Sequence, residues 1–220
     1  MTKAIVSLSG GMDSTTVLAV ALDQGRDVSA IGFFYNSKHN VYENQAAIKI
    51  VAYYDVPFKL IDLSQAMKGF TSNLMSEGGD IPEGHYEAEN MRLTVVPNRN
   101  MIFASILAGI AVSEGAEEIW LGTHMGDHYI YADCRPAFIA SLEQTIRLAT
   151  DTSISLISPF SNDKKVGILQ KGFSLAKPVP YHLTRTCYKA QSKACGKCGS
   201  CQERKESFTL LGKVDPIEYE

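Results

Sequence analysis

A glycine turn between an apolar run and a helical segment constrains this chain more than any other feature. Residues 4–6 (Ala-Ile-Val) predict a buried parallel strand, and residues 15–22 predict a helix that Gly25 can end. Between them stands Ser7-Leu8-Ser9-Gly10-Gly11-Met12-Asp13-Ser14. Glycines let a ligand approach the backbone closely, and the first amides of a helix have no partner within it. The turn therefore predicts a site for phosphate.

This turn lacks the lysine of the Walker loop. Its pattern S-G-G-x-D-S instead resembles the PP-loop of ATP pyrophosphatases, which cut ATP between the α and β phosphates. The resemblance implies an ATP site formed by Leu8, Ser9, Gly10, Gly11, Met12, Asp13, Ser14 and Thr15. The alternative is an ordinary glycine turn in which Asp13 or Ser14 caps the helix.

Apolar runs alternate with helical periodicity along the chain. Strands are predicted at 4–6, 29–35, 58–63, 118–122 and 155–158, and helices at 15–22, 43–54, 99–114, 136–149 and 164–176. Such alternation predicts an α/β fold, a doubly wound and mostly parallel five-stranded sheet covered on both faces. Ligands of these sheets lie at the carboxyl ends of the strands. We therefore expect segments 9–14, 36–40 and 123–135 to open onto one crevice.

One long segment, 69–97, interrupts this alternation and is rich in glycine and acidic residues. Loops of this length in a compact domain are commonly lids or disordered. We expect residues 1–180 to form the α/β domain, with 69–97 as a lid-like insertion. Residues 181–220 are expected to form a small C-terminal zinc-binding helical subdomain.

Composition narrows the classes of partner. The chain has 220 residues, 45% of them hydrophobic and 20% charged, and a net charge of −3. An acidic balance gives no electrostatic basis for wide nucleic-acid contact, so small-molecule substrates are favoured. No apolar run is long enough for a membrane span and no signal peptide is evident, so we expect a cytoplasmic protein without a membrane partner.

Four of the five cysteines are grouped near the C-terminus. Cys187, Cys195, Cys198 and Cys201 have the spacing C-x7-C-x2-C-x2-C, which predicts a closed structural zinc site of four thiolates. An iron–sulfur cluster and free redox thiols are the alternatives. The fifth cysteine, Cys134, is expected to be a buried or pocket-wall residue.

With the PP-loop near the N-terminus and the four cysteines near the C-terminus, the chain resembles the 7-cyano-7-deazaguanine synthases (the QueC family). Further matching pieces are Phe34-Tyr35-Asn36-Ser37-Lys38-His39, Val96-Pro97-Asn98-Arg99-Asn100, Tyr131-Ala132-Asp133-Cys134-Arg135 and Thr186-Cys187-Tyr188. Asn98 replaces the glycine of the family's V-P-G-R-N, and Ala132 replaces the proline of Y-P-D-C-R. Residues 125–130 replace the common E-T-D-F-S-G. These departures bear on substrate preference more than on ATP chemistry.

The resemblance implies an ATP-dependent ligase that converts 7-carboxy-7-deazaguanine and ammonia to the nitrile. Two ATP would be used with Mg²⁺, releasing AMP and pyrophosphate, and the resemblance also implies a homodimer. The alternatives are another PP-loop enzyme, amide-forming or tRNA-thiolating, and a non-catalytic zinc-containing module that binds nucleotide.

Several charged residues are candidates for the chemistry. Asp13 could ligate Mg²⁺. Arg99 stands at a helix start, where the dipole favours anions, so we expect it to meet phosphate or carboxylate, with a surface ion pair as the alternative. Asn100 follows it in the same family match. Lys165 matches a family lysine that could steady the phosphates, although Lys164 leaves the register open.

The segment after the fourth predicted strand contributes Asp127, Asp133 and Arg135. Carboxylates can read the amidine edge of a deazaguanine, and an arginine there can meet a charged group. The alternative is a solvated polar loop. Tyr35 and His39 follow the second strand and could contact the nucleotide or the base, although a lone histidine is commonly structural. His124 and His128 receive no role.

Overall fold

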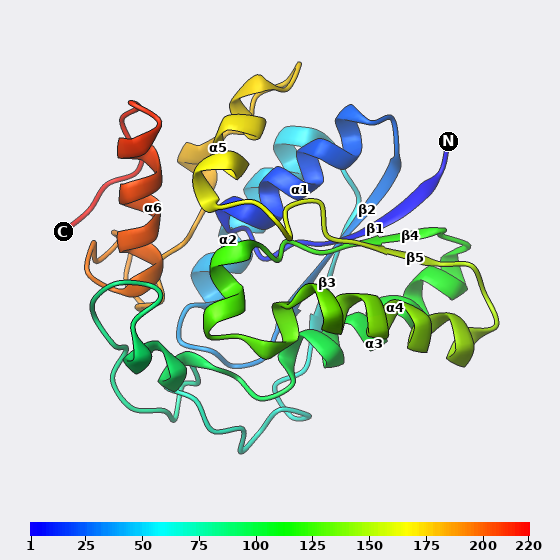
Figure 1. Cartoon of the computed structure of the whole chain (residues 1–220), viewed down its shortest axis with the longest axis horizontal. Helices are drawn as coiled ribbons and strands as arrows, with labels where there is room; N and C mark the ends of the chain where they lie inside the picture. Colours follow the sequence, from blue (N-terminus) through cyan, green and yellow to red (C-terminus); the bar gives the residue numbers. More distant parts are fainter.

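The predicted sheet is present and all of its strands are parallel. In the computed structural model, which describes all 220 residues, the strand order is β3-β2-β1-β4-β5 (Figure 1). The strands are β1 (Lys3–Ser7), β2 (Asp27–Phe34), β3 (Phe58–Asp62), β4 (Glu118–Trp120) and β5 (Ser155–Ile157). The strand order reverses between β1 and β4, which is where ligands of such sheets bind. The α/β prediction is confirmed.

Helices cover both faces of this sheet (Figure 1). They are α1 (Met12–Asp23), α2 (Asn40–Tyr54), α3 (Arg99–Glu114), α4 (Pro136–Thr150), α5 (Lys165–Ser174) and α6 (Gly199–Leu210). Alternation along β1 explains the two layers, because Ala4 and Val6 face α1, α2, α5 and α6 while Ile5 faces α3 and α4. The middle strands are thus buried on both sides.

Helix α2 begins three residues before the predicted start because Asn40 closes the turn after β2. Its Oδ1 accepts hydrogen bonds from the amides of Tyr35 and Ser37, at 2.9 and 3.0 Å. The Asn40 side chain is buried, so these two amides are satisfied without water. The turn fixes the segment that carries His39 against the end of β2.

The 69–97 segment packs against the C-terminal segment (Figure 1). It contains a short 3₁₀ helix, η1 (Glu89–Thr94), and buries Tyr86 and Met91. The amide of Gly84 donates to the Lys197 carbonyl at 3.1 Å. Whether this segment acts as a lid stays a prediction.

Residues 181–220 share a core with the sheet layer. Phe208 of α6 packs in the same cluster as α1 and α5. Arg204 is fully buried, pairs with Asp215 at 2.8 Å and donates to the Thr184 hydroxyl at 2.7 Å. The division at residue 180 stays a prediction. No helix of the structure is both long enough and apolar enough to cross a membrane.

Candidate active site and metal centre

A cavity of about 200 Å³ lies at the carboxyl ends of β1, β2 and β4. Its wall includes residues from all three segments that were expected to meet there, 9–14, 36–40 and 123–135. The crevice prediction is therefore confirmed. Residues from α2, α3 and α5 also line the cavity, Tyr86 comes from the 69–97 segment, and residues 185, 186, 188 and 200 come from the C-terminal segment.

The glycine turn forms one end of this cavity. Gly10 has a φ of +83°, and a Cβ there would lie 2.5 Å from the Glu43 carbonyl oxygen of α2, so only glycine fits. Gly11 is the residue before α1, and its amide donates to Ser9 Oγ at 3.2 Å. The hydroxyls of Ser9 and Ser14 lie 3.1 Å apart. The turn thus holds the first amides of α1 at the cavity.

Most of the predicted site residues come together here. The cavity wall contains Leu8, Ser9, Gly11, Met12, Asp13, Ser14, Tyr35, His39, Arg99, Asn100, Asp127 and Lys165. The sequence leaves open whether Lys164 or Lys165 is the lysine of the site. Lys165 is buried whereas Lys164 is exposed, which favours Lys165. The structure brings these residues into one cavity, and their roles stay predictions.

Four predicted site residues lie outside the cavity wall. Gly10 faces α2, and the Thr15 hydroxyl donates to the Gly11 carbonyl at 2.6 Å. Asp133 Oδ2 accepts from the amide of Asn100 at 2.9 Å, which anchors the start of α3. Arg135 is exposed and donates to a loop carbonyl. Each of the four makes contacts that support the shape of the site.

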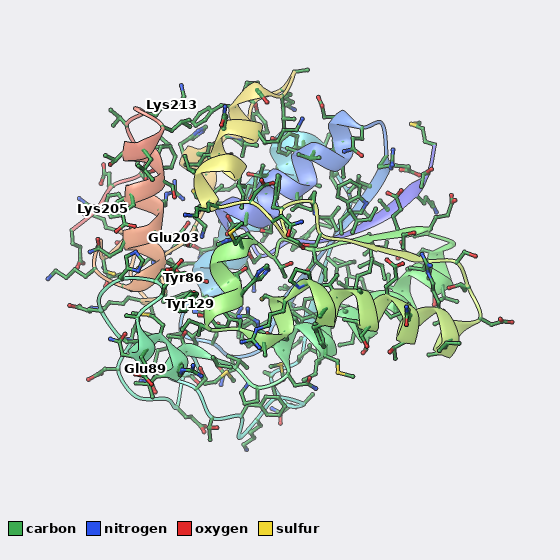
Figure 2. The ribbon with its side chains drawn as sticks, in the orientation of Figure 1. Tyr86, Glu89, Tyr129, Glu203, Lys205 and Lys213 are labelled. Atoms are coloured by element: carbon green, nitrogen blue, oxygen red, sulfur yellow. The ribbon has the colours of Figure 1, made fainter.

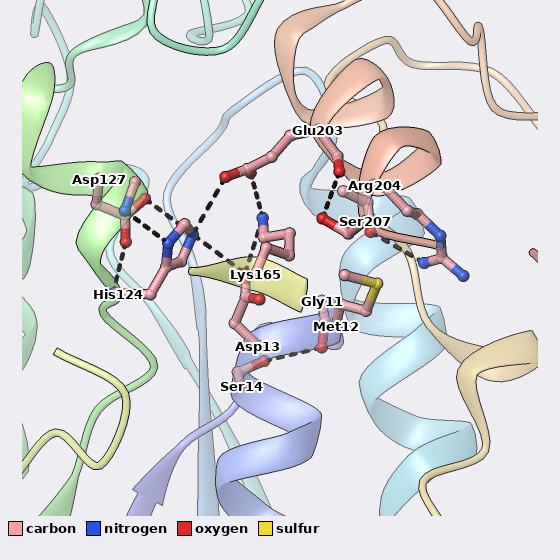
Figure 3. A network of polar contacts seen from close by, with 12 residues as sticks. Gly11, Met12, Asp13, Ser14, His124, Asp127, Lys165, Glu203, Arg204 and Ser207 are labelled. Carbon is pink, nitrogen blue, oxygen red and sulfur yellow. Dashed lines mark hydrogen bonds and ion pairs between the residues drawn. The ribbon is translucent and has the colours of Figure 1, made fainter. Parts of the chain in front are cut away.

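Paired charges gather at the phosphate end of the cavity, the part formed by α1, Lys165 and the residues around them (Figure 3). Lys165 Nζ lies 3.2 Å from Asp13 Oδ2 and 2.6 Å from Glu203 Oε2. Burial lowers the pKa of Lys165, but the carboxylates of Asp13, Glu203 and Asp127 outweigh burial and raise it above its ordinary value. Lys165 is therefore a buried permanent cation beside the glycine turn.

Asp127 and His124 form the neighbouring part of this network. Asp127 accepts from the Tyr86 hydroxyl at 2.7 Å and from the His124 amide at 3.0 Å. Burial raises the pKa of Asp127, but His124, Lys165 and these hydrogen bonds bring it below its usual range. His124 Nδ1 accepts from the Gly126 amide, so the ring proton lies on Nε2, 3.4 Å from Asp127 Oδ1. Asp127 is held as a carboxylate whose two oxygens are both engaged.

The opposite part of the cavity, the base end, is formed by β2, α2 and α3. Arg99 lines it without an ion pair, since the arginines that form ion pairs are Arg26, Arg147 and Arg204. Burial lowers the pKa of Arg99, but Tyr35 and other nearby groups outweigh burial and raise it. An arginine that stays charged with no carboxylate partner is suited to an anionic ligand.

Acidic and aromatic groups surround that arginine. Phe33 and Phe103 stack with centroids 4.1 Å apart, and both line the cavity. Burial raises the pKa of Glu43 to about 8 against the opposing effect of Arg99. Burial lowers the pKa of His39, 3.5 Å from Glu43, to about 3. At neutral pH this end therefore holds a neutral imidazole and a carboxyl group that readily keeps its proton.

The four clustered cysteines form a candidate metal centre. The sulfurs of Cys187, Cys195, Cys198 and Cys201 all lie within 4.8 Å of one another and are buried. The Cys195 and Cys201 sulfurs are 3.9 Å apart, close to the spacing that tetrahedral ligation by thiolates requires. Backbone amides of residues 189 and 195 donate to the Cys187 sulfur. Hydrogen bonds from Cys198 and Cys201 hold the pKa of Cys187 below its usual range. The cluster fits a metal ion.

Sequence reasoning missed several residues around the cavity. Glu43, Tyr86, Arg185 and Tyr188 line it, and Glu203 pairs with Lys165 behind it. In Figure 2, Tyr86 and Glu203 are neighbours where the 69–97 segment meets α6. Tyr188 is the last residue of the Thr186-Cys187-Tyr188 match, which was a usable signal. Glu203 stands two residues after a cysteine, and nothing in the spacing points it toward Lys165.

Two solved structures resemble the fold. NMN synthetase from Francisella tularensis superposes with a TM-score of 0.51 at 17% identity, covering 97% of this chain and 78% of that one. A 4-thiouridine synthetase solved with RNA and bound ATP gives a TM-score of 0.50 at 21% identity, covering 96% of this chain and 51% of that one. At these identities the likeness concerns the fold alone.

Sequence comparison is far more specific. A 7-cyano-7-deazaguanine synthase from Pseudoalteromonas translucida is 44% identical over 218 residues, 99% of each chain. The enzyme of the same name from Methanoregula boonei is also 44% identical with the same coverage. The family model described as "Queuosine biosynthesis protein QueC" matches residues 3–212. With this match over nearly its whole length, the chain belongs to the QueC family.

Proposed function

We propose that this protein is an ATP-dependent ligase that converts 7-carboxy-7-deazaguanine and ammonia to 7-cyano-7-deazaguanine. One observation carries the proposal: a single cavity joins the first amides of α1 and Lys165 at one end to Arg99 and stacked aromatic rings at the other. The similarity to synthases of that name over 99% of both chains supports the same reaction. The nitrile supplies a precursor for queuosine or a related 7-deazapurine.

The chemistry follows from the poor leaving ability of a carboxylate oxygen. The acid attacks the α-phosphate of ATP, expelling pyrophosphate and forming an acyl-adenylate. Ammonia displaces AMP to give the amide and loses a proton. The amide oxygen attacks a second ATP in the same way, and loss of AMP with two protons leaves the nitrile. Each AMP carries away one oxygen of the original acid, so one phosphate site serves both rounds.

The phosphate end is built to hold the leaving pyrophosphate. The amides of Met12 to Ser14 and the hydroxyls of Ser9 and Ser14 would donate to its oxygens. Lys165 adds a fixed positive charge. Asp13 Oδ1 is buried without a hydrogen-bond partner, which fits a cation brought in with ATP. Mg²⁺ bound there would spread the charge of the triphosphate.

The base end is suited to a planar, charged substrate. Arg99 would bind the 7-carboxylate or the α-phosphate, and the Phe33–Phe103 pair and Tyr35 give flat apolar surface for the ring. Asp127 already uses both oxygens, and Asp133 lies outside the cavity wall. Glu43 is therefore the carboxyl group best placed to read the amidine edge of the base, whose two N–H donors would favour its ionised form on binding.

The four cysteines are proposed to hold structural zinc. Buried sulfurs with a closed set of four ligands leave no open position for substrate, as expected for a structural centre rather than a catalytic one. Such a centre needs reduced thiols, which supports a cytoplasmic protein. An iron–sulfur cluster would give visible absorbance, so metal analysis and a spectrum of the purified protein separate the two.

Sulfur transfer is less well supported than nitrile formation. Cys134 is the only cysteine in the cavity wall, and it is 3% exposed. Burial raises the pKa of its thiol well above the usual range, which disfavours a thiolate nucleophile. A homodimer and the lack of a nucleic-acid partner stay predictions that mass photometry and RNA-binding measurements check.

The direct test supplies purified protein with ATP, Mg²⁺, ammonia and 7-carboxy-7-deazaguanine. AMP, pyrophosphate and the nitrile are followed together, and we expect two AMP for each nitrile. AMP with an amide but no nitrile would identify an amide-forming relative. ADP as the nucleotide product, or no nucleotide cleavage at all, would overturn the proposal.

A further inference from the structure

Glu203 stands out because its backbone belongs to the metal-binding segment and its carboxylate reaches the nucleotide side. It lies on α6 two residues after Cys201, and its side chain is only 15% exposed. Oε2 is 2.6 Å from Lys165 Nζ, and Figure 3 shows this pair beside Asp13. Glu203 does not line the cavity, so any effect on bound ATP must pass through another side chain.

Lys165 is a flexible side chain held between two carboxylates. Its ammonium lies 3.2 Å from Asp13 Oδ2 on one side and 2.6 Å from Glu203 Oε2 on the other, and 5.5 Å from the centre of the Tyr86 ring. A buried ammonium without the second carboxylate would turn fully onto Asp13, because an unpaired buried charge is costly. That movement would draw the lysine onto Asp13, which lines the cavity, and cover the Asp13 oxygens.

His124 also lies close to the Glu203 carboxylate. Its Nε2 is 3.9 Å from Glu203 Oε1 and 3.9 Å from Asp13 Oδ2, is buried and has no hydrogen-bond partner. Nε2 also lies 3.4 Å from Asp127 Oδ1, so three carboxylates surround this ring nitrogen. The Glu203 carboxylate thus lies close to Lys165 and His124, which are both outside the C-terminal segment.

The backbone around Glu203 is anchored on both sides. Cys198 precedes the first residue of α6, and Cys201 lies in its first turn. On the other side, Arg204 is fully buried and bonded to Asp215 and Thr184. A metal ion on the cysteines and the Arg204 contacts would together fix where the Glu203 side chain starts.

We propose that Glu203 is a positioning residue that keeps the Lys165 ammonium from closing fully onto Asp13 at the phosphate end of the cavity and thereby makes the metal-binding segment part of the ATP site. The proposal rests on the proposed ATP chemistry. It makes ATP binding and the two adenylation steps depend on Glu203, and leaves binding of the deazapurine acid unaffected.

The test uses the full-length, metal-loaded protein in a double-mutant cycle. Glu203→Leu keeps side-chain volume without an acceptor and is expected to lower kcat/KM for ATP by about 10- to 100-fold, the range of one charge-assisted hydrogen bond. KM for the acid should stay unchanged. Lys165→Met should lower kcat/KM more, and the double variant should be no worse than Lys165→Met alone.

Two further variants and three measurements separate positioning from folding. Glu203→Gln retains a carbonyl acceptor for the lysine and should recover part of the loss. Glu206→Gln changes an exposed glutamate on the same helix and should behave as wild type. Calorimetric binding of α,β-methylene-ATP, which the proposed reaction cannot cleave, gives an affinity independent of turnover, and zinc content and Tm report integrity.

The outcomes are distinct. Weaker analogue binding by Glu203→Leu at wild-type zinc content and Tm, together with a non-additive cycle, supports the proposal. Additive losses, or wild-type ATP parameters in a folded Glu203→Leu protein, overturn it. If Glu203→Leu fails to fold, wild-type affinity in Glu203→Gln overturns it and intermediate affinity supports it. Failure of the wild-type protein to make nitrile would overturn the proposed function alone. The role of Glu203 would still be decided by analogue binding.

Discussion

The two ends of the cavity hold their charges in opposite ways. At the phosphate end, Lys165 is already paired with Asp13 and Glu203. At the base end, Arg99 forms no ion pair, and burial favours the neutral form of Glu43. One end is therefore compensated within the protein, and the other leaves a charge for a ligand to neutralise.

This difference predicts distinct tasks for the two ends. A compensated cluster keeps its geometry whether or not ligand is present, as expected of groups that stabilise charge in a transition state. An uncompensated arginine gains most when an anion arrives, as expected of a residue that selects substrate. Substitutions at the phosphate end should therefore lower kcat, and substitutions at the base end should raise KM for the acid.

The largest expected effect is that of Asp13→Ala. Loss of this carboxylate frees Lys165 from one partner and removes the oxygen proposed to meet Mg²⁺, so turnover should fall by at least about 100- to 1000-fold. AMP release measured by chromatography checks this, with zinc content unchanged. Asp23→Ala, at the exposed end of the same helix, is the control. Near-normal AMP release by Asp13→Ala would contradict the contrast between the two ends.

Arg99→Lys should affect binding more than rate. Lysine keeps the charge but loses the planar fork, so KM for the acid should rise about 10- to 100-fold while KM for ATP changes little. Initial rates over both substrates measure the split. Arg92→Lys, on the exposed side of η1, is the matched control. A change confined to KM for ATP would place Arg99 at the phosphate end instead.

Cys198→Ser tests whether the cysteine cluster contributes to the stability of the fold. Removing one thiolate ligand should lower metal content and reduce Tm by roughly 10 °C, since metal binding contributes directly to folding. Metal analysis and differential scanning fluorimetry check both quantities. Cys134→Ser removes the cysteine outside the cluster and should retain the metal. A metal-free Cys198→Ser protein with wild-type Tm would overturn the structural role.

The smallest expected effect is a change in pH dependence at the base end. Burial raises the folded-state pKa of Glu43 to about 8. The folded protein therefore binds a proton more tightly than the unfolded chain, and stability falls as the pH rises from about 4.5 to 8, by at most about 1.4 kcal/mol per pH unit. Glu43→Gln stays neutral, so its Tm relative to wild type should rise by several degrees between pH 5 and pH 8. An unchanged difference across that range would show that Glu43 is ionised in the fold.

Much of the fold could be predicted because local pattern and tertiary structure agree. Each predicted strand and helix is present, and the carboxyl ends of the parallel strands meet as the topology requires. Asn98 shows how a local departure is tolerated. It has a φ of +57° at the start of α3, a conformation that asparagine adopts more readily than most residues, which explains its place where the family has glycine.

The rest of the site could not be predicted, because distant segments supply it. Tyr86 reaches Asp127 from the long insertion, and Glu203 reaches Lys165 from α6. Neither contact has a sequence spacing that would reveal it. Asp127 and Asp133 lie in the same predicted loop, and the sequence does not distinguish them. In the structure Asp127 lines the cavity whereas Asp133 anchors the start of α3, because the backbone of the loop turns between them.

The amide of Arg185 donates to the Gly10 carbonyl at 2.8 Å. This single bond joins the glycine turn to a segment that the ribosome makes much later. A nascent chain released before that point would carry the intact glycine motif without the C-terminal residues that line the cavity. Closure of the site thus waits for Arg185, and truncation of the chain before Arg185 should abolish nucleotide binding even though every residue of the motif is present.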